Sequence, residues 1–404
     1  MPWTPDEQNQ LTGFSRYSKE QFSRLERQHN IMVFVGNGFD LQILQKYEYP
    51  ADHQTTYSAF YKYLQTRNFE QSNCIFSAMQ REYAISQSED GHENWSDIEY
   101  HISNLVNSNH VGMDQLQSDL QAVQQEFVEF LQSIITPDLL QKLSSDTEEH
   151  GWSSRSLSSF LGDITDRTDF TSMKFPSSIN HYYLFNFQFI NFNYTPLLDN
   201  YIFLDKKQFN PLKNKTVDTH FLFRNDPLGY IHPNNVDDIG YSGYILTSVV
   251  HPHGDFNIPR SLLLGMDAPN NFKAYRDPRH KLSKPYWGRN NERFEASFKQ
   301  ADLFIIFGSS IGSSDGWWWR HIASELIDAA KDAQADDRAR EFEPELIIYR
   351  RTCGPNETPE STVKEFCRAA GYNPGTEPAE YLASRIHVVT YNDFTPRFFL
   401  STSN

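Results

Sequence analysis

The chain has 404 residues, a formal net charge of −16 at pH 7 and a globular composition in which 38% of residues are hydrophobic and 15% are aromatic. A chain of this length can bury a large core, so it suits one large domain with an insertion or two domains of ordinary size. The acidic balance gives no overall attraction to a phosphate backbone, which disfavours a nucleic-acid substrate without excluding a local basic groove.

The three cysteines, Cys74, Cys353 and Cys367, lie far apart and form no CxxC pair. This spacing excludes a four-cysteine zinc site and disfavours a disulfide framework. Residues 1–10 are polar, and no apolar run approaches the roughly 18 residues that a membrane span needs. We therefore expect neither a secretion signal nor a membrane segment, and a protein that works in the reducing cytoplasm.

The N-terminal part begins with a polar stretch, residues 1–30, that contains one short helical pattern at Phe22 and Leu25. The apolar run Ile31–Val35 then precedes a glycine turn, which predicts a strand buried on both faces. From about residue 51 to 180 we expect a helical insertion rather than an independent domain. Its clearest signal is a set of apolar residues at helical spacing: Leu116, Leu120, Val123, Phe127, Phe130, Leu131 and Ile134. The Ser-rich segment 144–159 predicts a loop within the insertion.

Short apolar runs resume after the insertion and predict further strands. These are Phe187–Asn193, Tyr244–Val250, Leu262–Gly265, Leu303–Phe307, Leu346–Tyr349 and Ile386–Thr390. Helical segments at Trp317–Ala330 and Ser361–Ala370 separate several of them. Strands that alternate with helices indicate βαβ units, so we expect an α/β fold with a Rossmann-like, mostly parallel sheet in one domain over residues 1–404.

Four of the expected strands end in turns of polar, glycine or other small residues. The turns are Gly36-Asn37-Gly38-Phe39-Asp40, Asn193-Tyr194-Thr195, His253-Gly254-Asp255, and Gly308-Ser309-Ser310 continuing to Asp315. Ligands of open parallel sheets bind beyond the carboxyl ends of the strands. We therefore expect the four turns to converge on one nucleotide-binding crevice. Asp97 and Glu99 of the insertion should overhang this crevice as part of a lid.

The two glycine turns are candidates for phosphate binding. Gly36 and Gly38 would let the backbone approach a pyrophosphate at a helix N-terminus. The full GxGxxG fingerprint is absent because Leu41 follows, and a plain tight turn explains the two glycines equally well. Gly308-Ser309-Ser310 would contact a second phosphate or a ribose, or it would serve simply as a helix N-cap.

Asn193 and His253 are the candidate catalytic residues. The Asn193 amide could position a water or a ribose hydroxyl, and the His253 ring could act as a general base near neutral pH. The alternatives are an ordinary turn asparagine and a structural histidine. His251 and His253 also have the spacing of one strand face, but no carboxylate or cysteine lies at a matching position, so we expect no metal.

Together these motifs resemble the AbiH abortive-infection family. The matching segments are GNGFD (Gly36 to Asp40), WSDIE (Trp95 to Glu99), FNYT (Phe192 to Thr195), His253-Gly254, and FGSSIGSSD (Phe307 to Asp315). Their order and spacing match from about residue 31 to 320. The resemblance implies an anti-phage abortive-infection effector.

A more distant resemblance is to the sirtuins, which carry a glycine-rich first turn, an Asn, a His-Gly pair and a late Gly-[ST]-Ser turn in this order. It implies that Asn193 and His253 act at the nicotinamide riboside bond of NAD, with water as the acceptor. The residues that would contact NAD are Gly36, Asn37, Gly38, Phe39, Asp40, Tyr194, Gly308, Ser309, Ser310 and Asp315. The cysteine pairs of the sirtuin zinc module are absent, which argues against protein deacylation. Thr195 stands where sirtuin-like defence proteins usually carry an Asp.

The leading hypothesis is therefore an NAD glycohydrolase. Because such an activity must be silent in healthy cells, we expect a homo-oligomer or a complex with a second defence protein to complete the pocket. One alternative is a nuclease in which Asp40, Asp97, Glu99 and Asp315 hold Mg²⁺. The other is a non-catalytic nucleotide sensor that acts with a partner.

Overall fold

The structure is a computed structural model, and it describes residues 27–87, 95–108, 111–203, 219–230, 241–267, 278–335, 343–352, 357–392 and 394–403. The helical pattern expected at Phe22 and Leu25 lies outside these residues. None of the helices in the described ranges combines the length with the apolar character that a membrane crossing requires.

The described strands form one seven-stranded sheet in the order β3-β4-β2-β1-β5-β6-β7. The bounds are β1 Gln28–Val35, β2 Tyr183–Asn191, β3 Thr219–Phe223, β4 Tyr241–Val250, β5 Leu303–Phe307, β6 Glu345–Arg351 and β7 Ile386–Tyr391. All neighbouring strands are parallel except β3 with β4. Without the edge strand β3, the parallel strands run third, second, first, fourth, fifth, sixth in chain order, as in Rossmann folds. The expected Rossmann-like sheet is confirmed.

The central strand β1 contributes side chains to two separate hydrophobic cores. Ile31, Val33 and Val35 enter one core, and Met32 and Phe34 enter the other. All five side chains are at most 1% exposed. A strand covered on both faces is what the continuous apolar run predicted. The chain order reverses between β1 and β5, and in open sheets this reversal point is where ligands bind.

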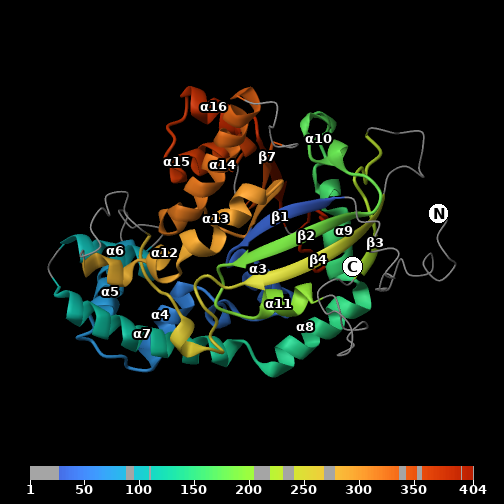
Figure 1. Cartoon of the computed structure of the whole chain (residues 1–404). Helices are drawn as coiled ribbons and strands as arrows, with labels where there is room; N and C mark the ends of the chain where they lie inside the picture. The colour runs from blue at the N-terminus through green and yellow to red at the C-terminus, as the bar shows by residue number, and fades with distance from the viewer. Residues whose placement is uncertain are drawn as a thin grey trace.

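One face of the sheet is covered by helices from the C-terminal part of the chain (Figure 1). These are α13 (Asn290–Gln300), α14 (Gly316–Ala335), α15 (Pro359–Ala369) and α16 (Glu377–Ala383). The sequence predicted α14 and α15 at 317–330 and 361–370, close to their observed bounds. The 3₁₀ turn η7 (Ser313–Asp315) leads directly into α14, so this helix begins beside the end of β5.

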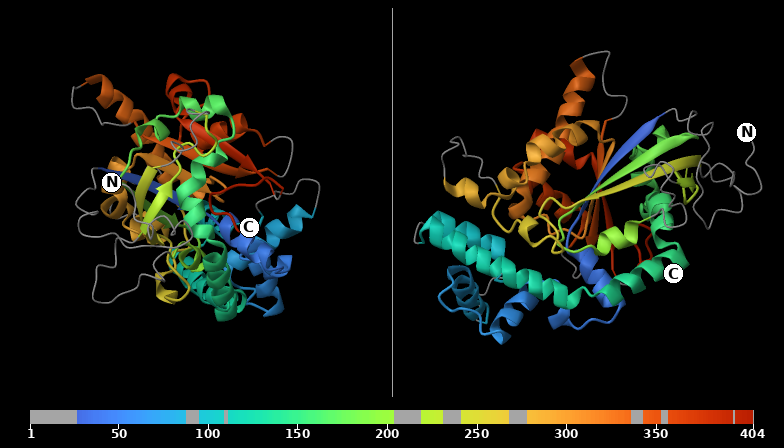
Figure 2. Two further views of the ribbon diagram at one scale, coloured as in Figure 1. Left: turned by 90° about the vertical axis from the view of Figure 1, so that its right-hand side faces the viewer. Right: turned by 60° about the horizontal axis from the view of Figure 1, so that its bottom comes forward.

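Between the short helix α3 (Gly38–Lys46) and β2, every regular element in the described residues is a helix or a 3₁₀ turn. The elements are η1 (Ala51–His53), α4 (Tyr57–Thr66), α5 (Cys74–Ser86), α6 (Ile98–Ser108), α7 (Met113–Ile134), α8 (Pro137–His150), α9 (Trp152–Ser159), η2 (Phe160–Asp163), α10 (Arg167–Ser172) and η3 (Pro176–Ser178). The right-hand view of Figure 2 shows α7 and then α8 running along one side of the sheet. All the apolar residues that predicted α7 are buried.

Before α13, the described parts of the connections around β3 and β4 contain four short elements. They are α11 (Leu197–Ile202), η5 (Pro259–Ser261), η6 (Pro278–Leu282) and α12 (Lys284–Trp287). The antiparallel strand β3 at the edge was not predicted, because its short run gives no clear signal in the sequence. Helix α11 contacts α3, α8 and β4, so it covers the face opposite to α13–α16.

Two sequence predictions are wrong. Residues 262–265 do not form a strand but a connection in which Leu262 and Leu264 are buried, so the apolar run indicated burial rather than strand pairing. The Ser-rich segment 144–159 is not a loop but the end of α8 and all of α9, separated by Gly151 with φ +60°. Its serines are accommodated because some are buried against backbone groups: Ser156 Oγ accepts the Leu400 amide at 2.8 Å.

Candidate nucleotide-binding site

The turns after β1 and β5 touch through their backbones at the reversal point of the sheet. The Gly36 amide donates to the Phe307 carbonyl at 2.9 Å, and the Gly38 amide donates to the Gly308 carbonyl at 2.8 Å. A Cβ on Gly36 or Gly38 would lie 2.7 Å from backbone atoms of the opposite turn. The backbone of Gly308 also has a φ of +65°, which residues other than glycine rarely adopt. The two turns therefore need their glycines to form one continuous floor.

Asp40 fixes the turn after β2 to the turn after β1. It lies in the first turn of α3 and is fully buried. Its Oδ1 accepts a hydrogen bond from Asn193 Nδ2 at 2.8 Å, and its Oδ2 accepts one from Thr195 Oγ1 at 2.6 Å. Burial raises the pKa of Asp40 to about 7, although the hydrogen bond from Thr195 opposes the rise. The Thr195 hydroxyl therefore binds this carboxyl group and joins the turn after β2 to α3.

Asn193 lies just beyond the end of β2, and its side chain is only 5% exposed. Besides Asp40, its Nδ2 donates to the Gly36 carbonyl at 3.1 Å. Both amide protons are therefore used within the protein, and Oδ1 is the side-chain atom that can meet a ligand. This oxygen can accept a hydrogen bond from a water or a ribose hydroxyl.

His253 follows β4 and is buried against Phe192, with the two ring centroids 5.2 Å apart. Its Nε2 lies 3.5 Å from Asp315 Oδ1. Burial, and then the charge of Lys284, lower the pKa of His253 to about 3. The sequence predicted a histidine that titrates near neutral pH, but in this position the ring stays neutral far below that pH.

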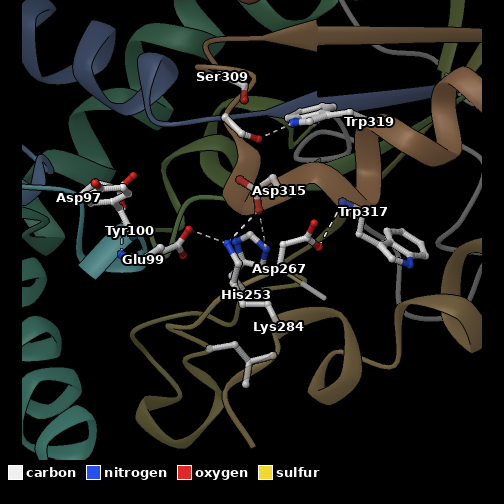
Figure 3. Close-up of polar contacts among 12 residues, drawn as sticks. Asp97, Glu99, Tyr100, His253, Asp267, Lys284, Ser309, Asp315, Trp317 and Trp319 are labelled. Atoms are coloured by element: carbon white, nitrogen blue, oxygen red, sulfur yellow. Dashed lines mark hydrogen bonds and ion pairs between the residues drawn. The ribbon is translucent and has the colours of Figure 1, made fainter. Parts of the chain in front are cut away.

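A buried ion cluster joins the helical insertion to the loops at the carboxyl edge of the sheet. Lys284 Nζ donates to Glu99 Oε2 at 2.7 Å and to Asp315 Oδ1 at 2.9 Å (Figure 3). Burial would lower the pKa of Lys284, but the two carboxylates hold it above its ordinary value. Burial raises the pKa of Glu99 to about 7 against the effect of Lys284. Lys284 keeps the pKa of Asp315 below its usual value despite burial.

Sequence reasoning missed Lys284. It stands at the start of α12 in a polar stretch, where a lysine is ordinarily a solvated side chain. The chain around it carries no motif, and its two partners lie 185 and 31 residues away. Only the folded chain brings the three together.

The candidate residues line one cavity of about 540 Å³ at the carboxyl edge of the sheet. From the predicted set these are Gly36, Asn37, Gly38, Asp40, Asp97, Glu99, Asn193, Tyr194, His253, Gly308, Ser309, Ser310 and Asp315. Sequence reasoning did not single out Tyr57, Lys284, Tyr349, Arg350, Arg351 and Tyr391, which also line it. The volume is within the usual range for small-molecule sites. The expected convergence of the four turns therefore occurs, with the insertion contributing Asp97 and Glu99.

Three of the predicted residues have structural tasks in the site. Phe39 is fully buried beneath the turn and packs against Tyr201 with ring centroids 5.4 Å apart, so its side chain does not line the cavity. Asn37 Oδ1 accepts a hydrogen bond from Thr55 Oγ1 at 2.7 Å, which ties the start of the insertion to the first turn. Asp97 Oδ1 accepts the Glu99 amide at 3.0 Å at the N-terminus of α6.

The four carboxylates of the nuclease alternative do not gather around a shared empty position. Asp40 is paired with a hydroxyl and an amide, whereas Glu99 and Asp315 share Lys284. A lysine ammonium thus occupies the place between these two carboxylates where a cation would sit. Across the described part of the chain, no group of three or more His, Cys, Asp or Glu side chains is arranged to hold a metal ion.

The sequence similarity to a known protein family includes the turns of the cavity. Residues 32–333 match the family described as bacteriophage abortive infection AbiH. The chain belongs to the AbiH family. The match runs from within β1 through most of α14 and therefore includes every turn of the cavity up to Asp315. No curated protein and no solved structure matches the chain significantly.

Membership of the AbiH family gives this protein a role in abortive infection by bacteriophage. The match confirms the resemblance to the AbiH family that the sequence motifs indicated. The more distant resemblance to sirtuins stays a prediction.

Proposed function

We propose that this AbiH protein cleaves the nicotinamide–ribose bond of NAD with water. The observation that supports the proposal is that Asn193 and His253 line the same cavity as the glycine floor, which is formed by Gly36, Gly38 and Gly308. The glycine floor at the start of α3 suits a pyrophosphate, because closely approaching backbone and a helix N-terminus both favour negative charge. Asn193 and His253 lie on the side of β2 and β4 and would meet the nicotinamide riboside.

In the proposed reaction the bond between the ribose C1′ and the nicotinamide nitrogen breaks, and its electron pair leaves with the nicotinamide. The positive charge of the ring is thereby neutralised, and an oxocarbenium-like ribose remains. The Asp315 carboxylate, whose pKa Lys284 keeps below its usual value, lies 3.5 Å from His253 Nε2 and would stabilise this cation.

Water then attacks C1′ and must lose a proton. Asn193 Oδ1 would orient this water by accepting one of its hydrogen bonds. The neutral His253 would accept the proton on Nε2, next to Asp315, and pass it to solvent. Because the pKa of His253 is about 3, the imidazolium would be short-lived, and we expect no titration of His253 in the rate between pH 5 and 8.

The proposal is tested by incubating the purified protein with NAD and measuring free nicotinamide and ADP-ribose, which should appear in equal amounts. We expect His253→Gln to lower the rate by about 10²–10⁴-fold, since glutamine cannot take the proton. The matched control is His53→Gln, at an exposed histidine outside the cavity, which should keep the parental rate. The same measurement is repeated after adding an extract of phage-infected cells, in case the enzyme needs a trigger that infection supplies.

NAD that stays intact in both assays, while ADP-ribose binds the purified protein, would contradict catalysis and favour a nucleotide sensor. A parental rate in His253→Gln would remove His253 from the mechanism. A rate that depends on added Mg²⁺ would contradict the proposed mechanism and favour the metal-dependent nuclease.

A further inference from the structure

A second cavity, of about 490 Å³, opens beside the proposed NAD cavity and shares Gly38, Arg351 and Tyr391 with it. One wall is a face of α3, formed by Gly38, Gln42, Gln45 and Lys46, whose spacing places them on successive turns of the helix. The other walls are the end of β7 and the C-terminal segment 394–403. The second cavity is therefore continuous with the glycine floor.

The charge of this second cavity is opposite to that of the whole protein. Lys46, Arg351 and Arg397 line it, and none of the described residues in its lining is Asp or Glu. The chain as a whole carries 52 acidic and 36 basic residues. A lining with three cationic side chains and, among its described residues, no carboxylate favours an anion over a cation as the ligand.

Arg397 is held in place by neutral groups. Its Nε donates to the Phe399 carbonyl at 3.0 Å, and its guanidinium also donates to the Gln42 side chain. The guanidinium lies over the Tyr391 ring, 4.2 Å from the centroid. These contacts orient the cation and are themselves neutral. The charge of Arg397 also acts on the buried Asp163, whose pKa it lowers against the effect of burial.

Hydroxyl and amide groups complete the lining. The hydroxyls of Thr395, Ser401, Thr402 and Ser403 and the amide of Gln45 line the same cavity as the three cations. The Gln42 amide donates within the protein, to the Leu400 carbonyl and the Thr402 hydroxyl. Phosphate oxygens accept hydrogen bonds from such donors and from guanidinium and ammonium groups. The chemistry of the second cavity thus fits a phosphate group better than a neutral sugar.

The position of the second cavity indicates which part of the dinucleotide would carry this phosphate. If the nicotinamide riboside lies at Asn193 and His253, beyond β2 and β4, the adenosine end extends in the opposite direction across β5 toward β6 and β7. Arg351 ends β6 and Tyr391 ends β7. An arginine beside the adenosine ribose can bind a 2′-phosphate, because its guanidinium donates two parallel hydrogen bonds to phosphate oxygens.

We propose that the second cavity binds the 2′-phosphate of NADP, so that the 2′-phosphorylated dinucleotide is the preferred substrate. This inference rests on the proposed function for the orientation of the dinucleotide. Glu357, the acidic residue that lines this side of the main cavity, lies 3.9 Å from Arg350 and does not line the second cavity. The nearest charges to the 2′-position are then Arg351, Lys46 and Arg397.

The test uses ADP-ribose and 2′-phospho-ADP-ribose, which lack nicotinamide, so that binding is measured apart from cleavage. Calorimetry with the full chain should show that the phosphorylated ligand binds at least about tenfold more tightly, with a ratio that falls as salt rises. Lys46→Ala and Arg351→Ala should each lower this ratio toward one. Lys62→Ala, at an exposed lysine on α4 outside both cavities, is the charge-matched control and should keep both affinities at parental values.

Equal affinities, tighter binding of ADP-ribose, or a ratio that survives both substitutions would overturn the inference. Nicotinamide release from NAD and from NADP is measured in parallel. Cleavage of NAD without preference for NADP would support the proposed function and contradict this inference. A strong preference for the phosphorylated ligand without cleavage of either dinucleotide would uphold the second cavity and contradict the proposed function.

Discussion

Asp40 links folding to pH at the scale of a single side chain. Its pKa is raised by burial to about 7 in the folded protein, compared with an ordinary value of 3.8. The folded chain therefore binds this proton more tightly than the unfolded chain does, and the contribution of Asp40 to stability falls as pH rises from about 4 to 7. Above pH 7 the protein keeps an ionised carboxylate in its interior.

We expect Asp40→Asn to raise the free energy of unfolding at pH 8 by about 2–4 kcal/mol and to change it little at pH 4. An asparagine can accept the hydrogen bond from Asn193 and donate one to the Thr195 hydroxyl, so the geometry is kept. Denaturant unfolding at the two pH values measures the effect. The control is Asp52→Asn at an exposed position. A loss of stability at pH 8 would mean that the charge of Asp40 is needed in the fold.

Asn193 has a structural task in addition to its proposed catalytic one. Its two hydrogen bonds join the turns after β1 and β2. We expect Asn193→Ala to abolish NAD cleavage and to cost about 1–3 kcal/mol of stability, because the buried Asp40 and the Gly36 carbonyl lose a partner. Thermal unfolding and nicotinamide release of the same preparation separate the two effects. A folded variant with the parental rate would show that Asn193 is structural alone.

At the scale of elements, the contact between the turns after β1 and β5 creates the floor of the site. We expect Gly308→Ala to weaken ADP-ribose binding by at least tenfold and to destabilise the protein by about 1–3 kcal/mol. The added Cβ would lie 2.9 Å from the Phe39 amide nitrogen and 3.0 Å from Gly38 Cα, so the turns must separate.

The matched control is Gly371→Ala. Gly371 also has a positive φ, +87°, but a Cβ there would meet nothing within 4 Å. It therefore carries the same backbone strain without the close contact. Calorimetric binding and thermal unfolding of both variants isolate the contact; equal effects of the two substitutions would mean that strain alone accounts for the loss.

At the scale of the whole molecule, Lys284 connects the helical insertion with the sheet. We expect Lys284→Met to destabilise the protein by about 3–5 kcal/mol at pH 8, because Glu99 and Asp315 would be left as buried, uncompensated carboxylates. The loss should shrink toward pH 5, because burial already raises the pKa of Glu99 to about 7 beside Lys284, and without the lysine Glu99 takes up a proton more readily still.

Glu99→Gln in the Lys284→Met background should restore part of this stability by removing one charge. Denaturant unfolding of the parent, the two single variants and the double variant gives the coupling free energy directly. Hydrogen exchange of α6 and α7 shows whether the insertion separates from the sheet. Additive losses would contradict the idea that the ion cluster acts as a connection between the two parts.

Local sequence patterns were enough to predict the fold class and the turns of the site. The apolar run of β1 predicted a strand covered on both faces, and the spacing in α7 predicted a long amphipathic helix, because burial of a strand or helix leaves a local period in the sequence. The glycine motifs and the Asn193 and His253 turns could be placed at strand ends for the same local reason. The predictions of a strand at 262–265 and of a loop at 144–159 were wrong because local composition indicates burial or polarity but does not identify hydrogen-bond partners.

The tertiary structure alone decided how the chemistry is distributed. The partners of Lys284, the pKa of His253 and the basic second cavity all depend on residues far apart in the chain. Burial and the field of distant charges set these properties, and both arise only when the chain folds. A histidine that sequence reasoning places near neutral pH thus becomes a neutral side chain, and an acidic protein gains a cationic cavity beside its candidate active site.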